Sequence, residues 1–395
     1  MPALLKSHFL LDPDIIFLNH GSFGATPKPV FAEYQRWQAE LERQPVEFLG
    51  RRFTALMAEA RAHLAAYLGA AAEDVVYFPN PTTALNMVAR SLGRHNRPPL
   101  QPGDEILTTN HEYGAMDRMW AFVCKQVGAS YIRRPVTLPV TAHEEFVENF
   151  WGGVTDRTRL IFLSHITSPT ALTLPGREIC RRAREAGLLT VIDGAHAPGQ
   201  LPINLTELGV DIYAGACHKW LSAPKGSAFL YVRREIQALL DPLVISWGWG
   251  GDEIPPTPGM GQTPFISFHE WQGTRNPAAF LSVPAAIQFQ ADHNWDAVRR
   301  ECRALASQTR DRLNALTGLA PLCPDSSEWL SGQMFTVRLP DSVDAEALKT
   351  RLYDQFRIEV PIFKWSDQNL MRVSFQGYNT QEEADALVEA MKKLL

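Results

Sequence analysis

Residues 188–232 read LLTVIDGAHAPGQLPINLTELGVDIYAGACHKWLSAPKGSAFLYV, and this stretch decides the fold. Its three apolar runs predict buried strands: Leu188–Ile192, Ile212–Gly215 and Ser227–Val232. Asp193 directly follows the first predicted strand, and Lys219 lies just beyond the second. Ligands of open α/β sheets bind outside the carboxyl ends of the strands. We therefore expect the acid and the lysine to act on one ligand.

The pairing of Asp193 with Lys219 has two interpretations. Most charged side chains are solvated, so Asp193 could cap a turn and Lys219 could lie at the surface. A carboxylate at the end of a core strand is costly, however, unless it meets a cation or several donors. Pyridoxal 5'-phosphate (PLP) needs both groups, because a lysine holds it as a Schiff base and an acid keeps its ring nitrogen protonated. His196, His218 and the flanking strands favour this second interpretation.

Four motifs resemble those of one enzyme family. DGAHAPGQLPINL (193–205) and ACHKWLSAPKG (216–226) resemble the PLP-lysine region of the class V aminotransferase group, which has fold type I. FLNHGSFGATPKPV (17–30) and TTNHEYGAMDR (108–118) are most similar to isopenicillin N epimerases and their relatives. The resemblance extends from about Phe17 to the last helix. It implies fold type I, PLP as the cofactor and an amino acid as the substrate.

The order of predicted elements agrees with an α/β fold. Strands and helices alternate from 75 to 232, which predicts a mainly parallel central sheet covered by helices on both faces. The elements beyond 286 predict a smaller α+β C-terminal domain. We expect an N-terminal arm at 1–30, a large PLP-binding domain at 31–285 and the small domain at 286–395. A Gly/Pro/Trp-rich connection at 241–276 lacks the GxGxxG pattern of a dinucleotide site.

Composition excludes several classes of protein. The 395 residues include 38 basic and 43 acidic side chains, a net charge of −5 without a basic block, so we expect no nucleic-acid partner. The five cysteines are scattered and form no CxxC, which predicts neither a disulfide framework nor a metal site. The sequence has no run of eighteen apolar residues and no signal-peptide pattern. We therefore expect a cytoplasmic protein without a membrane partner.

Several polar residues are candidates for the cofactor phosphate. Thr82 and Thr83 open a predicted helix, where hydroxyls and free N–H groups suit a phosphate dianion, although Thr82 could be an ordinary N-cap. The resemblance assigns this turn, and also His218, to the phosphate. It further implies that Thr274 reaches the phosphate of the neighbouring subunit's cofactor. A homodimer with shared active sites follows from that implication.

Other residues are candidates for the cofactor ring. Tyr113 follows a predicted strand, where an aromatic side chain can stack on a planar pyridine. The resemblance places an aromatic or imidazole ring on the cofactor at this position. It also implies that Thr167 or Ser168 reaches the ring hydroxyl and that His196 bonds the ring oxygen.

Two regions are candidates for substrate binding. By resemblance, the glycine-flanked loop with Asn19 and His20 borders the substrate carboxylate, although its spacing also fits a plain turn. Arg372 lies inside the predicted strand 371–375 and needs an anionic partner unless its tip reaches solvent. It matches the family's carboxylate-binding arginine, so we assign it to the substrate α-carboxylate.

The resemblance implies that the Lys219 amine removes the Cα proton of an α-amino acid while Asp193 supports the cofactor ring. Epimerisation then needs a second acid, for which Tyr113 or His20 is a candidate. Cysteine or cysteine-sulfoxide C–S lysis and transamination remain alternatives. Desulfurase chemistry is disfavoured, because residues 358–372 contain no cysteine. A non-catalytic binding module of the same fold is the alternative from a different class.

Overall fold

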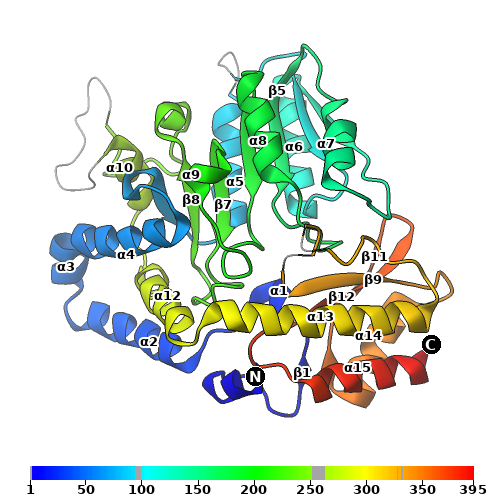
Figure 1. Cartoon of the computed structure of the whole chain (residues 1–395). Coiled ribbons are helices and arrows are strands. Elements are labelled where there is room, and N and C mark those ends of the chain that lie inside the picture. Colours follow the sequence, from blue (N-terminus) through cyan, green and yellow to red (C-terminus); the bar gives the residue numbers. More distant parts are fainter. Residues whose placement is uncertain (1, 95–98, 251–262, 327, 331) are drawn as a thin grey trace.

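The computed structural model describes residues 2–94, 99–250, 263–326, 328–330 and 332–395. Residues 251–262 of the Gly/Pro/Trp-rich connection lie outside this part of the chain. A large sheet with helices on both faces lies above a smaller sheet and its helices, and the N-terminal segment packs with the C-terminal elements (Figure 1).

The large sheet has seven strands in the order β2-β8-β7-β6-β5-β3-β4. They are β2 (Val75–Phe78), β3 (Glu105–Thr109), β4 (Ser130–Arg134), β5 (Thr158–Ser164), β6 (Leu189–Asp193), β7 (Ile212–Ala216) and β8 (Ala228–Val232). Strand β8 is antiparallel to both of its neighbours, β2 and β7, and so runs opposite to the other strands of the sheet. The sheet is therefore mainly parallel, as predicted, and six of its carboxyl ends point the same way.

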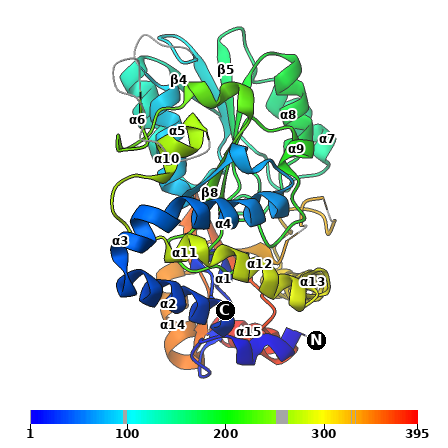
Figure 2. The same ribbon diagram turned by 90° about the vertical axis from the view of Figure 1, so that its left-hand side faces the viewer.

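Both faces of this sheet are buried. Leu160 and Phe162 of β5 pack into a cluster with residues of α5 (Pro81–Leu92), α6 (Gly114–Val127) and α10 (Pro264–Glu270). Ile161 and Leu163 face the opposite way and pack with residues of α4 (Phe53–Leu68), α7 (His143–Trp151) and α8 (Gly176–Glu185). Apolar side chains on both faces explain why the strands read as continuous hydrophobic runs. Figure 2, turned by 90°, shows the two helical layers on either side of the strands.

The helices of the large sheet and of the connection to the small sheet have these bounds: α2 (Lys28–Arg43), α3 (Pro45–Glu47), α4 (Phe53–Leu68), α5 (Pro81–Leu92), α6 (Gly114–Val127), α7 (His143–Trp151), α8 (Gly176–Glu185), α9 (Leu205–Leu208), α10 (Pro264–Glu270), α11 (Ala278–Leu281) and α12 (Val283–Asp292). Shorter turns of 3-10 or π type are η2 (Phe48–Arg52), η3 (Ala72–Asp74) and η4 (Arg234–Leu239). The expected domain division at 285/286 stays a prediction, and it falls inside α12.

The small sheet is antiparallel and has the order β11-β12-β9. Its strands are β9 (Met334–Leu339), β11 (Ile362–Trp365) and β12 (Gln368–Ser374), and its helices are α13 (Trp295–Thr317), α14 (Ala345–Phe356) and α15 (Gln381–Leu394). A capping box at Thr380 and Glu383 begins α15. The central strand β12 carries Arg372 opposite Thr336 of β9.

The N-terminal arm joins this small sheet rather than hanging free. It contains η1 (Pro2–His8), β1 (Ile16–Phe17) and α1 (His20–Phe23). Strand β1 pairs in parallel with β10 (Ile358–Glu359), and Asn19 forms a bridge with Ser374 at the end of β12. The first residues of the chain are thereby held beside its last strands. In the described part of the chain, no helix combines the length and the apolar character needed to cross a bilayer.

Candidate active site

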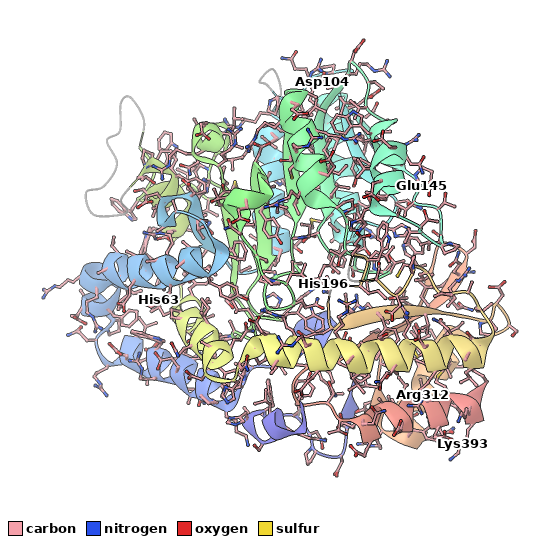
Figure 3. The ribbon with its side chains drawn as sticks, in the orientation of Figure 1. His63, Asp104, Glu145, His196, Arg312 and Lys393 are labelled. Atoms are coloured by element: carbon pink, nitrogen blue, oxygen red, sulfur yellow. The ribbon has the colours of Figure 1, made fainter. Side chains whose placement is uncertain are left out.

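Lys219 and Asp193 line the same cavity, whose volume is about 150 Å³. It lies at the carboxyl ends of the large sheet, where the loops after β2, β3, β5, β6 and β7 meet. Its lining residues that the sequence had singled out are Thr82, Tyr113, Ser168, Asp193, His196, His218 and Lys219. Figure 3 shows His196 at the level where the large sheet meets the small one. The predicted acid and lysine therefore face one space.

Lys219 is a buried amine. Its Nζ lies 3.3 Å from Nε2 of His196. Burial, together with the charge of Arg372, lowers the pKa of Lys219 to about 8, although the charge of Asp193 acts in the opposite direction. An amine with this pKa is in part unprotonated near neutral pH, which is the form that condenses with an aldehyde.

Asp193 ends β6 and is also buried. Its Oδ1 accepts a hydrogen bond from the Ala195 N–H at 2.9 Å. Burial raises the pKa of the Asp193 carboxyl, although the Ala195 N–H and the Lys219 charge lower it. A cationic ring nitrogen placed here would compensate the desolvation of the carboxylate.

The first turn of α5 presents one of its two threonines to the cavity. Asn80 is the N-cap, because its Oδ1 accepts hydrogen bonds from the Thr83 N–H at 2.8 Å and the Thr83 hydroxyl at 3.0 Å. Thr83 therefore turns toward Asn80 and does not line the cavity. N-capping by Thr82, the alternative interpretation, is wrong, and Thr82 faces the cavity. His218 donates its Nδ1–H to the Ser227 carbonyl at 3.0 Å, so its Nε2 remains available.

Among the candidate contacts of the cofactor ring, too, some residues line the cavity and one does not. Tyr113, at the N-cap of α6, lines the cavity with 48% of its surface exposed. Ser168 also lines the cavity. Thr167 does not, because its hydroxyl holds a turn, accepting the Leu172 N–H at 2.9 Å and contacting the Thr170 hydroxyl at 2.8 Å. Of the two candidates for the ring hydroxyl, Ser168 lines the cavity and Thr167 does not.

Asn19 and His20 support the site from behind instead of facing a substrate. His20 is fully buried, with its Nδ1 3.0 Å from the Tyr378 hydroxyl and its Nε2 3.0 Å from the Lys219 carbonyl. Burial lowers the pKa of His20 to about 3, so the ring is neutral. Asn19 donates to Glu359 at 2.9 Å. Their expected roles as substrate contacts, and the role of His20 as second acid, do not fit this placement.

The same N-terminal loop reaches the cavity through Ser22 and Phe23. Gly24 follows with φ of +68°, and a Cβ there would come within 2.0 Å of the His218 carbonyl oxygen. Only glycine fits at this position, both for its backbone conformation and for its approach to the lysine loop. The sequence signal that could have identified Ser22 and Phe23 is their position between Gly21 and Gly24.

Arg372 is buried behind this loop and forms no ion pair with any acidic side chain that the structure describes. Its Nη1 donates to the Ser168 carbonyl at 2.7 Å and hydroxyl at 3.0 Å, and its Nη2 donates to the Ser22 hydroxyl at 3.2 Å. Its Nε–H has no partner among the described residues. Burial lowers the pKa of Arg372 to about 10, still leaving it charged at neutral pH. A buried guanidinium held by two cavity-lining serines fits an anionic ligand.

A second carboxyl, Glu112, lies behind Asp193. It accepts hydrogen bonds from the Ser164 N–H at 2.7 Å, the Ser164 hydroxyl at 2.6 Å and the Thr109 hydroxyl at 2.6 Å. Burial raises the pKa of Glu112 to about 7, and the charge of Asp193 adds to this effect. Glu112 thus ties β3 to β5 beneath the site.

Thr274 lies outside the cavity and is exposed on the segment after α10. Among the residues with described placement, no three His, Cys, Asp or Glu side chains are arranged to hold a metal ion.

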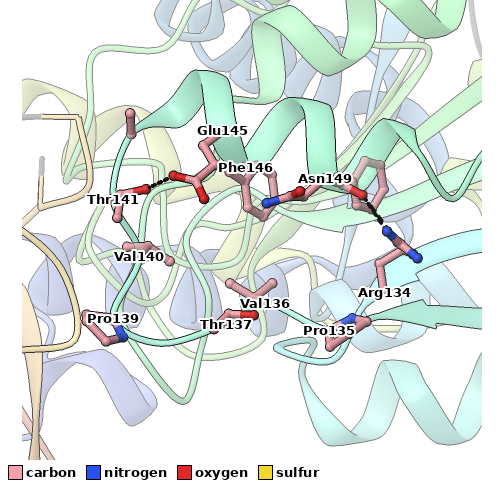
Figure 4. Close-up of a pocket in the computed structure, with 12 residues that line it drawn as sticks. Arg134, Pro135, Val136, Thr137, Pro139, Val140, Thr141, Glu145, Phe146 and Asn149 are labelled. Carbon is pink, nitrogen blue, oxygen red and sulfur yellow. Dashed lines mark hydrogen bonds between the residues drawn. The ribbon is translucent and has the colours of Figure 1, made fainter.

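A different cavity of about 280 Å³ lies between the end of β4 and α7 (Figure 4). Its two charged side chains are already satisfied. Arg134 donates to the Asn149 carbonyl, and Glu145 accepts from the Thr141 hydroxyl (Figure 4). This cavity contains neither a lysine nor a buried acid, so it does not compete with the one around Lys219.

Comparisons with known proteins identify the family of this chain. The sequence profile of the family described as aminotransferase class-V matches residues 25–387. Isopenicillin N epimerase of Amycolatopsis lactamdurans is 40% identical over 99% of this chain and 98% of that protein. The Streptomyces clavuligerus enzyme of the same name is 36% identical over 98% and 97%. A putative L-cysteine desulfhydrase 2 of rice is 29% identical over 97% and 85%.

Solved structures share the fold. The apo cysteine desulfurase of Thermococcus onnurineus NA1 has a TM-score of 0.85 at 21% identity, covering 100% of this chain and 98% of that one. A C-DES variant with glycine covalently linked to its PLP cofactor has a TM-score of 0.82 at 21% identity, covering 99% of each chain. The architecture is fold type I, as predicted. The chain therefore belongs to the class V aminotransferase family.

Proposed function

We propose that this protein is a PLP-dependent epimerase that inverts Cα of an α-amino acid, as the name isopenicillin N epimerase implies for its relatives. The observation that carries the proposal is that Lys219 and Asp193 share one cavity. Arg372, a cation without an acidic partner among the described residues, approaches this cavity through Ser22 and Ser168. Bound PLP supplies an electron sink that makes the Cα proton of an attached amino acid acidic.

Different residues of the chain hold different parts of this cofactor. Asp193 pairs with the ring nitrogen. His196 and Ser168 serve the ring oxygen side, while Thr82 and His218 serve the phosphate. The free N–H groups of the first turn of α5 and its dipole add to the phosphate site. These assignments are supported by the shared cavity and by the donors that each residue has available.

Three residues act on the substrate. Arg372 binds the α-carboxylate with its free Nε–H and remaining N–H donors, which fixes the orientation of the amino acid. Lys219, with its pKa lowered to about 8, takes the Cα proton. Tyr113 is the acid that returns a proton to the opposite face. It is favoured over His20 because Tyr113 lines the cavity and His20 does not.

C–S lysis is the second candidate function. It is supported by the 29% identical rice relative, named as a putative L-cysteine desulfhydrase. A persulfide route through a protein thiol has less support. Cys217 and Cys323 are both buried, and burial raises the pKa of Cys323 to about 12. A thiol that stays protonated is a poor nucleophile.

One experiment separates the reactions. The holoenzyme is incubated in deuterated water with a panel of L-amino acids, including isopenicillin N and cysteine. Deuterium at Cα together with inversion supports the epimerase. Pyruvate with released thiol would select the lyase, and a 2-oxo acid with pyridoxamine phosphate would select a transaminase. Tyr113→Phe should still exchange the Cα proton of one enantiomer but lose inversion.

The visible absorption spectrum of the purified protein tests the alternative of a non-catalytic binding module. The purified protein should have the visible absorption of an imine, and borohydride should abolish it. Lys219→Ala should lack it. A colourless wild-type chain that captures no added PLP would contradict both enzyme proposals.

We also propose a cytoplasmic homodimer in which Thr274 of each subunit completes the partner's phosphate site. The exposure of Thr274 supports the shared site, and five free, buried cysteines fit a reducing compartment. Mixing Lys219→Ala with Thr274→Val after subunit exchange should restore roughly a quarter of wild-type activity, because one site in each mixed dimer is intact. No recovery would indicate that each site is built from one subunit.

A further inference from the structure

The indole of Trp220 bonds the imidazole that faces the catalytic lysine. Trp220 follows Lys219 directly, and its Nε1–H donates to Nδ1 of His196 at 3.3 Å. An indole N–H can only donate a hydrogen bond. Nδ1 of His196 is therefore the acceptor and carries no proton.

The other nitrogen of His196 then carries the proton of the neutral ring. Burial lowers the pKa of His196 well below its usual value, and the charges of Lys219, Arg372 and His218 add to this effect. A second proton, on Nδ1, would also point toward the indole N–H and remove the acceptor of its hydrogen bond. The neutral ring thus directs an Nε2–H toward Lys219, whose Nζ is 3.3 Å away.

Trp220 has little freedom to turn away. It is fully buried, and its ring centroid lies 4.9 Å from that of His20. Its carbonyl accepts a hydrogen bond from the Gln290 amide at 2.9 Å. Gly199 approaches the same backbone so closely that a Cβ would lie 2.2 Å from the carbonyl carbon of Trp220. These contacts hold the indole N–H in one place.

We propose that Trp220 is a positioning residue, which holds His196 as a neutral imidazole protonated on Nε2, so that a hydrogen-bond donor always faces the Lys219 amine. In the cofactor-free protein, this donor requires the amine to accept, which favours its unprotonated and nucleophilic form. With the cofactor of the proposed function in place, the same donor favours the anionic form of the adjacent ring oxygen. The tautomer itself does not depend on which reaction follows.

The chain offers a matched pair of substitutions. Trp220→Phe keeps an aromatic ring against His20 but removes the N–H and part of the ring volume. Trp120→Phe is the control, because Trp120 is equally buried, packs against Phe162, and has an Nε1–H without a partner among the described residues. Both variants lose the same volume from a packed interior, and only the first loses a hydrogen bond.

The first readout is the ¹⁵N NMR signal of the histidine side chains in the purified protein, with and without PLP, assigned with His196→Gln. We expect wild-type His196 to be the neutral Nε2–H tautomer across neutral pH. In Trp220→Phe, the exposed Nδ1 should take up a proton at a pH higher by about one unit, and Trp120→Phe should match the wild type. A protonated Nδ1 in the wild type would overturn the proposal even if Trp220→Phe does not fold.

The second readout is the pH at which the visible band of the bound cofactor changes. Trp220→Phe should raise this midpoint by about one unit relative to Trp120→Phe. Equal midpoints in the two variants would refute the positioning role. Absence of any visible band would instead contradict the proposed cofactor, and the NMR result on the free protein would still decide the tautomer.

Discussion

Replacing Arg372 by lysine tests how the site recognises its substrate. Three hydrogen bonds, two to Ser168 and one to Ser22, hold the guanidinium plane, while the Nε–H has no partner in the part of the chain that the structure describes. Lysine keeps the positive charge but has a single ammonium group, which cannot bond both serines and also grip a carboxylate with two parallel donors. The substitution therefore removes the arrangement of parallel hydrogen-bond donors and preserves the positive charge.

The expected loss follows from one charge-assisted hydrogen bond, worth about 1.5–3 kcal/mol. This corresponds to a fall in kcat/KM of between about 10-fold and 150-fold for the α-amino acid. An amine analogue that lacks the α-carboxylate should react equally slowly with the wild type and with Arg372→Lys. The ratio of kcat/KM for the two substrates is thus the decisive quantity.

Arg338→Lys is the matched control, because Arg338 lies on β9 of the same small sheet and donates to the Ala320 carbonyl at 2.7 Å. It should keep wild-type kinetics. If Arg372→Lys retained both its KM for the amino acid and its discrimination against the amine, the assignment of the carboxylate site would be refuted. Retained cofactor absorbance would show that the variant had folded.

Three further predictions concern the packing and charge around the site. Gly24→Ala should abolish PLP capture, because its Cβ would lie 2.0 Å from the His218 carbonyl oxygen. Gly318→Ala is the control: Gly318 has a similar φ of +67°, but a Cβ there would meet open space, so this variant should bind PLP normally. Equal PLP binding by the two variants would contradict the steric argument. Glu112 has a folded pKa of about 7, above its unfolded value of 4.5, so its stabilising contribution is complete below about pH 4.5 and is lost as pH rises to about 7. The difference in unfolding free energy between the wild type and Glu112→Gln should therefore change by about 3 kcal/mol across this window in denaturant titrations, and a constant difference would show that the carboxyl does not titrate there. Because the pKa of Lys219 is lowered to about 8, the rate of PLP capture by the apo-protein, measured by stopped-flow absorbance, should rise with pH up to about 8 and then level off. A rate that continues to rise to pH 10 would show that the pKa of Lys219 is not lowered.

Much of the fold could be predicted because its elements carry strong local patterns. Apolar spacing and clear end signals predict a strand at 75–78 and a helix at 295–317, and β2 and α13 have these bounds. Strand β4 (SYIRR) has no such signal, because it is an edge strand with partly exposed, polar side chains and has no apolar run. The pattern of residues 277–291 predicts one long helix, which the structure divides at Ser282 into α11 and α12.

The site could be predicted only where a strand end alone fixes the position. Asp193 and Lys219 follow strands, so their approach to one another follows from the topology of the sheet. The direction of side chains within a loop depends on tertiary contacts instead. That is why His20 faces the Lys219 backbone while Ser22 faces the cavity, and why the Ser22–Arg372 contact, between residues far apart in the sequence, has no local signal.

The pairing of β1 with β10, and of Asn19 with Ser374, has a consequence for how the protein matures. The loop that supports Lys219 from behind is anchored on segments that are synthesised more than three hundred residues later. We therefore expect a chain that ends before β10 to contain Lys219 and Asp193 but to lack the partners that hold this loop in place.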